Sequence, residues 1–215
     1  MKKYNCIIFD LDGTLANTYP GIFNSYHYAC ETMGIELPTD AVVGAAIGAP
    51  LLEVFEKRFH LDREVAITAT EHYRKYYAEK GIYEAIAYEG MQQTLKYLKE
   101  NGYLVAVATL KKEEFAIDIL KELKLAEYFD VIVGMNAGDS LTKAQMLEKV
   151  CAMLKVDKAG AVLVGDSSYD AIGASEADMD FIGVTYGFGF KNAEDVSQYA
   201  TYAIIDEPME LTKYL

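Results

Sequence analysis

Three aspartates are the residues of this sequence that most directly suggest chemistry. Asp10 and Asp12 stand two positions apart near the amino terminus, and Asp166 lies far along the chain within residues 165–170. Carboxylates brought together repel one another, and the chain already carries a formal net charge of -13. A hard divalent cation removes this conflict, and Mg²⁺ typically binds one or two carboxylates, water and a substrate phosphate. If the fold brings the three side chains together, the sequence predicts a magnesium site.

A hydroxyl and a lysine could bind the phosphate that such a metal accompanies. Thr109 ends an apolar run and begins a predicted helix, so its hydroxyl and the backbone amide of Leu110 could donate to an anion. Lys143 lies in the first turn of a predicted helix, where the helix dipole disfavours a cation unless an anion is bound beside it. Each residue also has an ordinary explanation, because Asp166 and Thr109 could be turn or cap residues and Lys143 a solvated surface lysine.

The elements that must position these side chains alternate along the chain. Short apolar runs at residues 6–9, 104–108, 131–133, 161–164 and 181–184 indicate buried strands. Stretches of helical period at residues 91–101, 112–123, 142–154 and 169–177 stand between or after them. The alternation predicts an α/β fold, a Rossmann-like, doubly wound parallel sheet. Ligands bind such a sheet beyond the carboxyl ends of its strands, where the polar residues stand.

One segment breaks this alternation. Residues 20–84 contain no run typical of a strand and instead suggest helices around residues 21–33, 51–60 and 63–80. We therefore predict an α-helical cap domain over residues 17–85, inserted into a core formed by residues 1–16 and 86–215. Hinges are expected near residues 17–20 and 85–89.

Composition narrows the class of protein. The 215 residues include 52% hydrophobic ones, and 33 acidic residues stand against 20 Lys and Arg. This charge repels nucleic acid and anionic membranes, so we expect neither as a partner. The three cysteines form no CxxC pair, and the apolar run before Asp10 is too short for a signal peptide, so we expect a cytoplasmic protein. Either a monomer or a homodimer is expected.

The polar groups together resemble the motifs of a known superfamily. Residues 7–15, IIFDLDGTL, are similar to the first motif of the haloacid dehalogenase superfamily of phosphohydrolases, hhhDxDGT followed by Leu. Residues 105–109 resemble its second motif, Lys143 its third and residues 165–170, GDSSYD, its fourth. The resemblance covers the whole chain, and the helical insertion stands where the family's first type of cap domain does.

The resemblance implies a role for each acidic residue. Asp10 would attack phosphorus and form an aspartyl phosphate, while Asp12 would protonate the leaving oxygen and then activate water. Mg²⁺ would be held by the Asp10 side chain, the Asp12 carbonyl and Asp166, with Asp170 supporting the site. The presence of an acid at Asp12 argues for phosphoryl transfer, because the dehalogenases of the superfamily lack one there. The resemblance therefore implies a magnesium-dependent phosphatase.

The resemblance also implies which residues bind substrate. Thr109, Leu110 and Lys143 would contact the phosphoryl group, although Leu110 replaces a Ser or Asn of many relatives and offers only its backbone amide. Residues 44–51, with Gly48 among them, resemble the substrate-facing turn of phosphoglycolate phosphatase-like caps. Asn17 stands where an acid is common after the first motif.

The substrate, a small-molecule phosphate ester, stays open at this point. The branch with the strongest resemblance contains phosphoglycolate phosphatases and 5'-nucleotidases, but residues 44–52 hold no Arg or Lys to bind a carboxylate. The cap tyrosines could stack on a nucleobase, but tyrosines at helical spacing more often pack between helices. The alternatives are a phosphosugar mutase of the same superfamily, which protects its aspartyl phosphate from water, and a non-catalytic phospholigand-binding homologue.

Overall fold

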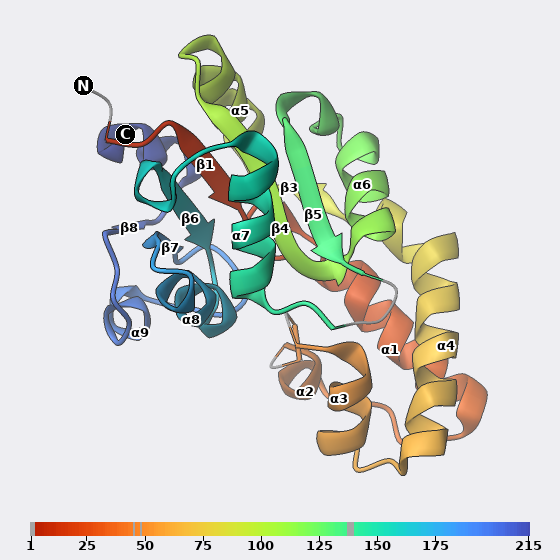
Figure 1. Ribbon diagram of the computed structural model, residues 1–215. Helices are drawn as coiled ribbons and strands as arrows, with labels where there is room; N and C mark the ends of the chain where they lie inside the picture. The colour runs from red at the N-terminus through yellow and green to blue at the C-terminus, as the bar shows by residue number, and fades with distance from the viewer. Residues whose placement is uncertain (1–2, 45, 48, 137–139) are drawn as a thin grey trace.

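The chain folds around one parallel β-sheet. The computed structural model describes residues 3–44, 46–47, 49–136 and 140–215. Six strands pair in parallel in the order β5-β4-β1-β6-β7-β8 (Figure 1). They are β1 (Cys6–Phe9), β4 (Leu104–Lys112), β5 (Val131–Met135), β6 (Ala161–Gly165), β7 (Asp180–Val184) and β8 (Ala203–Ile205). The α/β fold class and the five predicted strands are confirmed, and β8 is an additional strand.

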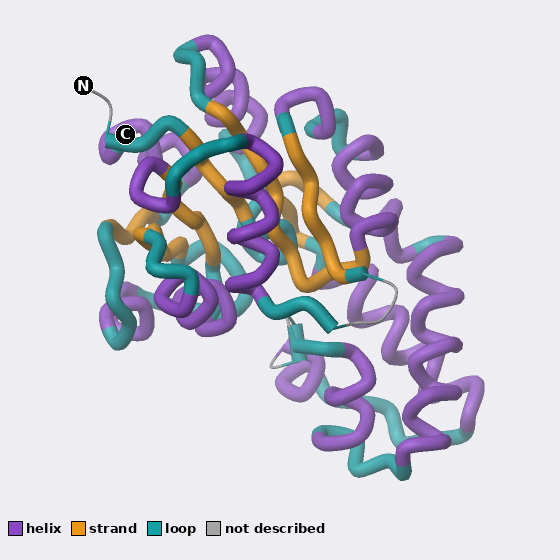
Figure 2. The backbone as a smooth tube through the Cα atoms, viewed as in Figure 1, coloured by secondary structure: helices purple, strands orange, loops and turns teal. Residues whose placement is uncertain are grey.

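Helices cover both faces of this sheet (Figure 2). They are α5 (Met91–Glu100), α6 (Glu113–Glu122), α7 (Lys143–Leu154), α8 (Ser168–Glu176) and α9 (Ala193–Ser197), with single 3₁₀ segments η2 (Ala126–Tyr128), η3 (Lys158–Gly160) and η4 (Pro208–Tyr214). Side chains of a strand alternate between the two faces. Ile7 and Phe9 of β1 therefore enter the core under α5 and α6, whereas Ile8 enters the core under α7 and α8.

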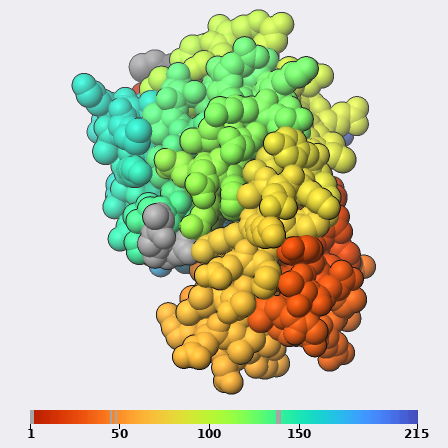
Figure 3. Space-filling view, turned by 90° about the vertical axis from the view of Figure 1, so that its right-hand side faces the viewer, coloured from red at the N-terminus to blue at the C-terminus, as the bar shows by residue number. Residues whose placement is uncertain are grey.

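A separate group of helices lies beyond the carboxyl ends of the strands (Figure 1), and its orange and yellow residues form the lower part of the molecule in Figure 3. It consists of α1 (Tyr19–Met33), α2 (Asp40–Gly44), α3 (Leu51–Lys57), α4 (Arg63–Glu79) and the 3₁₀ segment η1 (Gly81–Glu84). The helices α1 and α4 lie side by side, and aromatic rings of α1, α3 and α4 pack against one another. Tyr26, for example, contacts the rings of Phe55 and Tyr73 at centroid distances of 5.4 and 4.8 Å.

A short antiparallel ribbon pairs the segment before this helical group with the segment after it. β2 (Ala16–Asn17) pairs with β3 (Ile86–Ala87), so that Ala16 faces Ala87 and Asn17 faces Ile86. The pairing brings the entry and exit of the predicted cap segment to one place. The ribbon therefore supports the predicted domain division, which stays a prediction.

One predicted boundary is wrong and bears on the site. The second core strand does not end at Ala108 but runs to Lys112, and the following helix begins at Glu113. Its pairing with β5 shifts register between Ala108 and Lys112, where the partner advances only from Val133 to Met135. Two extra residues therefore form a bulge in β4. Thr109 lies in this bulge rather than at the start of a helix.

Within the described residues, no helix is both long and apolar enough to cross a membrane.

Candidate active site

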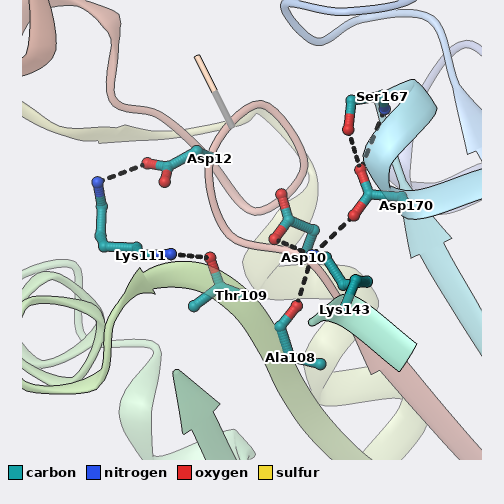
Figure 4. A network of polar contacts seen from close by, with 8 residues as sticks. All are labelled: Asp10, Asp12, Ala108, Thr109, Lys111, Lys143, Ser167 and Asp170. Atoms are coloured by element: carbon teal, nitrogen blue, oxygen red, sulfur yellow. Dashed lines mark hydrogen bonds and ion pairs between the residues drawn. The ribbon is translucent and has the colours of Figure 1, made fainter. Parts of the chain in front are cut away.

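Asp10 and Lys143 meet at the carboxyl end of the central strand β1 (Figure 4). Lys143 Nζ lies 2.8 Å from Asp10 Oδ1, 2.8 Å from Asp170 Oδ1 and 2.9 Å from the carbonyl oxygen of Ala108. Its side chain is only 5% exposed. The ordinary interpretation of Lys143 as a solvated surface lysine is therefore wrong, because the ammonium is buried between two carboxylates.

The start of α7 explains why Lys143 is presented in this way. Thr142 caps the helix, since its hydroxyl accepts from the amide of Gln145 and its own amide donates to the Gln145 side chain. This capping box fixes the first turn. Lys143 is the first residue of that turn, and its side chain reaches under the strand ends.

The fourth predicted strand end supplies two more carboxylates. Asp166 follows β6, and its Oδ2 accepts from the backbone amides of Phe188 and Gly189 at 2.7 and 3.0 Å. Asp170, in the first turn of α8, accepts from the hydroxyl of Ser167 at 2.6 Å. The segment around Phe188 thus orients Asp166 through two backbone amides, a role that residue types alone do not indicate.

Close packing around Asp166 requires a glycine at position 13. Gly13 has a φ of +85°, and a Cβ there would lie 2.2 Å from Asp166 Oδ2. Only glycine adopts this conformation readily and leaves space for the carboxylate. The turn after β1 therefore brings its aspartates against the end of β6.

Burial strongly affects the protonation of these carboxylates. Burial, followed by the nearby charges of Asp170 and Asp12, raises the pKa of Asp10 to about 7 despite the opposing effect of Lys143. Burial, together with Asp170 and Asp10, raises the pKa of Asp166 to about 8. Burial disfavours the Lys143 ammonium, but Asp10 and Asp170 outweigh it and raise the pKa of Lys143. Such a group of acids would be stabilised in its charged form by a cation.

The donor set fits a hard divalent metal. Asp10, Asp166 and Asp170 are buried, and each offers an oxygen within 4.8 Å of those of the other two. Among the described residues, no ion pair involves Asp166, so its charge lacks a direct cationic partner. Oxygen-only ligands of this kind suit Mg²⁺. The side chain of Asp12 is not part of this group, and a metal contact through its carbonyl stays a prediction.

Asp12 instead lies between Thr18, which precedes α1, and Lys111 of β4. Its Oδ1 accepts from the hydroxyl of Thr18 and lies 3.0 Å from Lys111 Nζ. The two charged side chains are 8% and 9% exposed, so the pair is nearly shielded from water. Sequence reasoning missed Lys111, although its position two residues after Thr109 was an available signal.

The phosphate-binding candidates differ in their surroundings. Thr109 is buried, and its hydroxyl oxygen accepts from the amide of Lys111 at 3.2 Å, which leaves the hydroxyl proton available to a ligand. Leu110 lines the same cavity as Thr109 and Lys143. Gly48 lies outside the described residues.

Two cavities meet at the carboxylates of Asp10 and Asp12. One of about 430 Å³ lies between the strand ends and the helices α1, α3 and α4, and a second of about 690 Å³ borders Asp166 and Phe188. Asp10 and Asp12 line both. The first cavity also contains Arg63 and Arg74 of α4 and Lys112 of β4. Residues 44–52 contain no Arg or Lys, so the cations that line this cavity come from α4 and β4.

Comparisons with known proteins agree with this geometry. A family model described as haloacid dehalogenase-like hydrolase matches residues 7–184. A 5'-nucleotidase of Pseudomonas aeruginosa is 32% identical over 87% of this chain and 85% of its own length. A phosphoglycolate phosphatase of Neisseria meningitidis is 34% identical over 88% of this chain and 83% of its own length. The crystal structure of a predicted phosphatase from Clostridium acetobutylicum superposes with a TM-score of 0.90 at 36% identity, covering 98% and 97% of the two chains.

Proposed function

This chain belongs to the haloacid dehalogenase-like hydrolase family, and we propose that it hydrolyses a small-molecule phosphate monoester. The proposed reaction uses Mg²⁺ and proceeds through an aspartyl phosphate. The match to the family model and the names of the two relatives identify the chain as a phosphatase. The observation that carries the finer proposal is the arrangement of Asp10. It is buried at the mouth of two cavities, with Lys143 on one oxygen and three further carboxylates nearby.

In the first step, Asp10 attacks phosphorus in line with the ester oxygen. A bond forms between an Asp10 carboxylate oxygen and phosphorus while the phosphorus–ester oxygen bond breaks. Asp12 gives its proton to the departing oxygen, which leaves as an alcohol. Lys143 holds Oδ1 of Asp10, and the described residues make no hydrogen bond to its other oxygen, which suits that oxygen to attack.

In the second step, water releases the phosphate. Asp12, now ionised, takes a proton from a water molecule as this attacks phosphorus. The bond between phosphorus and Asp10 breaks, so inorganic phosphate leaves and the carboxylate is restored. Thr109 and Lys143 would donate to the phosphoryl oxygens, whose charge is the main obstacle to phosphoryl transfer.

Asp10, Asp166 and Asp170, with the carbonyl of Asp12, would hold Mg²⁺, which supplies positive charge for the phosphoryl oxygens when bound. The chain's own residues do the remainder. Phe188 and Gly189 orient Asp166 through their amides, and Ser167 orients Asp170.

The cap cavity bears on the class of leaving group. Arg74 and Lys112 place cations on its wall, Arg63 is paired with Glu56 of the same wall, and Tyr26 and Tyr73 add aromatic rings. We propose a metabolite-sized substrate whose leaving group carries an anionic or aromatic part, as in the substrates named for the two relatives. Retention of phosphate on the product, with a bisphosphate required for turnover, would instead favour the mutase.

Turnover of p-nitrophenyl phosphate by the pure protein tests the reaction. We expect release that depends on Mg²⁺ and stops with chelator, and we expect Asp10→Asn to lower kcat by about 10⁴-fold or more. Far-ultraviolet circular dichroism of the variant should match that of the wild-type protein. Substantial turnover by Asp10→Asn, or release that continues unchanged in chelator, would contradict the proposal. A panel of phosphoglycolate, nucleoside monophosphates and sugar phosphates then identifies the leaving group.

The cysteines bear on the cellular compartment in which the protein works. Cys6, Cys30 and Cys151 are all buried and none forms a disulfide. Free buried thiols are typical of a reducing compartment, so we propose a cytoplasmic protein.

A further inference from the structure

Lys111 is a buried cation that the proposed reaction leaves without a role. It stands on the core strand β4, yet its ammonium lies 3.0 Å from Asp12 Oδ1 and its side chain is 8% exposed. Burial disfavours the ammonium, but Asp12 and Tyr77 outweigh it and raise the pKa of Lys111. A lysine held charged in such a place would cost stability unless the pairing were well formed. Its position therefore calls for a specific explanation.

The bulge in β4 is what directs Lys111 toward Asp12. The two extra residues between Ala108 and Lys112 break the alternation of side chains at this point. The amide of Lys111 donates to the Thr109 hydroxyl, which fixes the bulge at the phosphate-binding end of the strand. Figure 4 shows the Lys111 side chain passing from this bulge to the carboxylate of Asp12.

Two donors from different parts of the molecule hold the same oxygen of Asp12. Lys111 approaches Oδ1 from the core, and the hydroxyl of Thr18 approaches it from the segment that leads into α1. The other oxygen of Asp12 has no partner among the described residues' hydrogen bonds and ion pairs. An acid that must give up a proton needs one oxygen free and the carboxylate plane fixed, and this arrangement meets both conditions.

A cap residue covers Lys111. The ring of Tyr77 on α4 has its centroid 4.4 Å from Lys111 Nζ, a distance typical of a cation–π contact. Tyr77 is 1% exposed and packs between Tyr73 and Phe115, at centroid distances of 5.8 and 5.4 Å. The contact crosses from the cap helix to the core strand and keeps water from the ammonium.

We propose that Lys111 is a positioning residue that fixes the carboxylate of Asp12 for proton transfer, and that Tyr77 makes this position depend on the cap. This inference rests on the proposed acid role of Asp12. When α4 is in place, the ring of Tyr77 keeps water from the contact between Lys111 and Asp12 Oδ1. The ammonium then holds this oxygen while the other oxygen carries the proton, and it stabilises the carboxylate that forms once the proton is given up. When α4 is displaced, the ammonium is hydrated and its hold on Asp12 weakens.

Leaving groups of different basicity separate positioning from a merely structural role. An alkyl phosphate needs a proton on its leaving oxygen, whereas p-nitrophenolate leaves without one. The value of kcat/KM reports steps up to phosphoryl transfer, so the later base role of Asp12 does not enter it. We expect Lys111→Met to lower kcat/KM for the best alkyl substrate of the panel by about 10 to 10²-fold and for p-nitrophenyl phosphate by only about 3-fold or less.

Conservative and matched variants complete the experiment. Lys111→Arg keeps the charge and is expected to recover most of the alkyl-to-aryl ratio. Lys99→Met removes another paired lysine, on α5 and 2.7 Å from Asp130, and should leave the ratio unchanged. Thermal unfolding of every variant shows whether a loss reflects the fold.

Tyr77 gives a second, independent test if Lys111→Met folds poorly. Tyr77→Phe keeps the ring that covers the ammonium and should retain most of the alkyl-to-aryl ratio, whereas Tyr77→Ala should show the same selective loss for alkyl esters. Tyr76→Ala is the control on the same helix, because its ring contacts Tyr28 rather than Lys111. Equal losses for both substrates in Lys111→Met and Tyr77→Ala, or no loss in either, would overturn the inference.

Asp12→Asn separates this inference from the function beneath it. If Asp12→Asn loses alkyl turnover selectively, the acid role holds, and the behaviour of Lys111→Met alone decides the inference. If Asp12→Asn shows no such selectivity, both the acid role and the positioning role built on it are wrong, while hydrolysis through Asp10 is judged by its own variant.

Discussion

A glycine on α8 determines how closely Lys143 can approach the carboxylates. A Cβ added at Gly173 would lie 2.4 Å from Lys143 Cγ and 2.5 Å from Lys143 Cβ. Both are atoms at the base of the side chain, which the capped first turn of α7 holds in place. The lysine can therefore pack under the strand ends only because position 173 has no side chain.

Gly173→Ala is consequently expected to displace Lys143 and reduce activity. A misplacement near 1 Å can cost about 10²-fold in rate, so we expect kcat to fall by about 10 to 10²-fold. Alanine favours a helix by about 1 kcal/mol over glycine, so the helix itself gives no reason for a loss. Steady-state kinetics with p-nitrophenyl phosphate measure the effect, and Ser175→Ala, at an exposed position of the same helix, is the control. Wild-type kcat in Gly173→Ala would show that Lys143 can shift without consequence.

At the scale of elements, the start of α7 depends on its capping box. Thr142→Ala removes the hydroxyl that accepts from Gln145 and should lower the free energy of unfolding by about 1 kcal/mol. For a chain of this length, the midpoint of thermal unfolding should fall by about 2–4 °C. Thr142→Ser retains the acceptor and should unfold near the wild-type temperature. An unchanged midpoint in Thr142→Ala would mean that packing under the sheet fixes Lys143 without the cap.

Individual elements differ in how well the sequence predicts them. Strands at residues 6–9 and 161–164 are continuous apolar runs buried on both faces, so their positions and the acids that follow them were evident. The end of β4 was not evident, because the bulge depends on pairing with β5 and three residues there, Thr109, Lys111 and Lys112, are polar. Lys111 belongs to that bulge, and its contacts with Asp12 and Tyr77 join segments far apart in the chain. The short strand β8 and helix α2 lack a strong periodic pattern.

At the scale of the whole molecule, negative charge is concentrated where the metal is expected. The chain has a formal charge of -13, and the buried carboxylates add local repulsion to it. The pKa of Asp10 is raised to about 7 and that of Asp166 to about 8, from an ordinary value of 3.8. In the metal-free protein these groups therefore bind protons that the unfolded chain releases at much lower pH.

This difference fixes the sign of a pH effect on stability. A carboxyl group with a raised pKa in the folded protein stabilises the fold fully below its unfolded pKa and loses that contribution as pH rises through its folded pKa. Metal binding requires the ionised form, so Mg²⁺ should bind more tightly as the same protons leave. We expect an excess of Mg²⁺ to raise the unfolding temperature more at pH 8.5 than at pH 6. Comparing samples with Mg²⁺ and with chelator at each pH cancels the titration of all other groups. Asp166→Asn removes one of the two acids, so the Mg²⁺ effect on the unfolding temperature should differ less between the two pH values. An equal Mg²⁺ effect at both pH values in the wild-type protein would refute this account of the cluster.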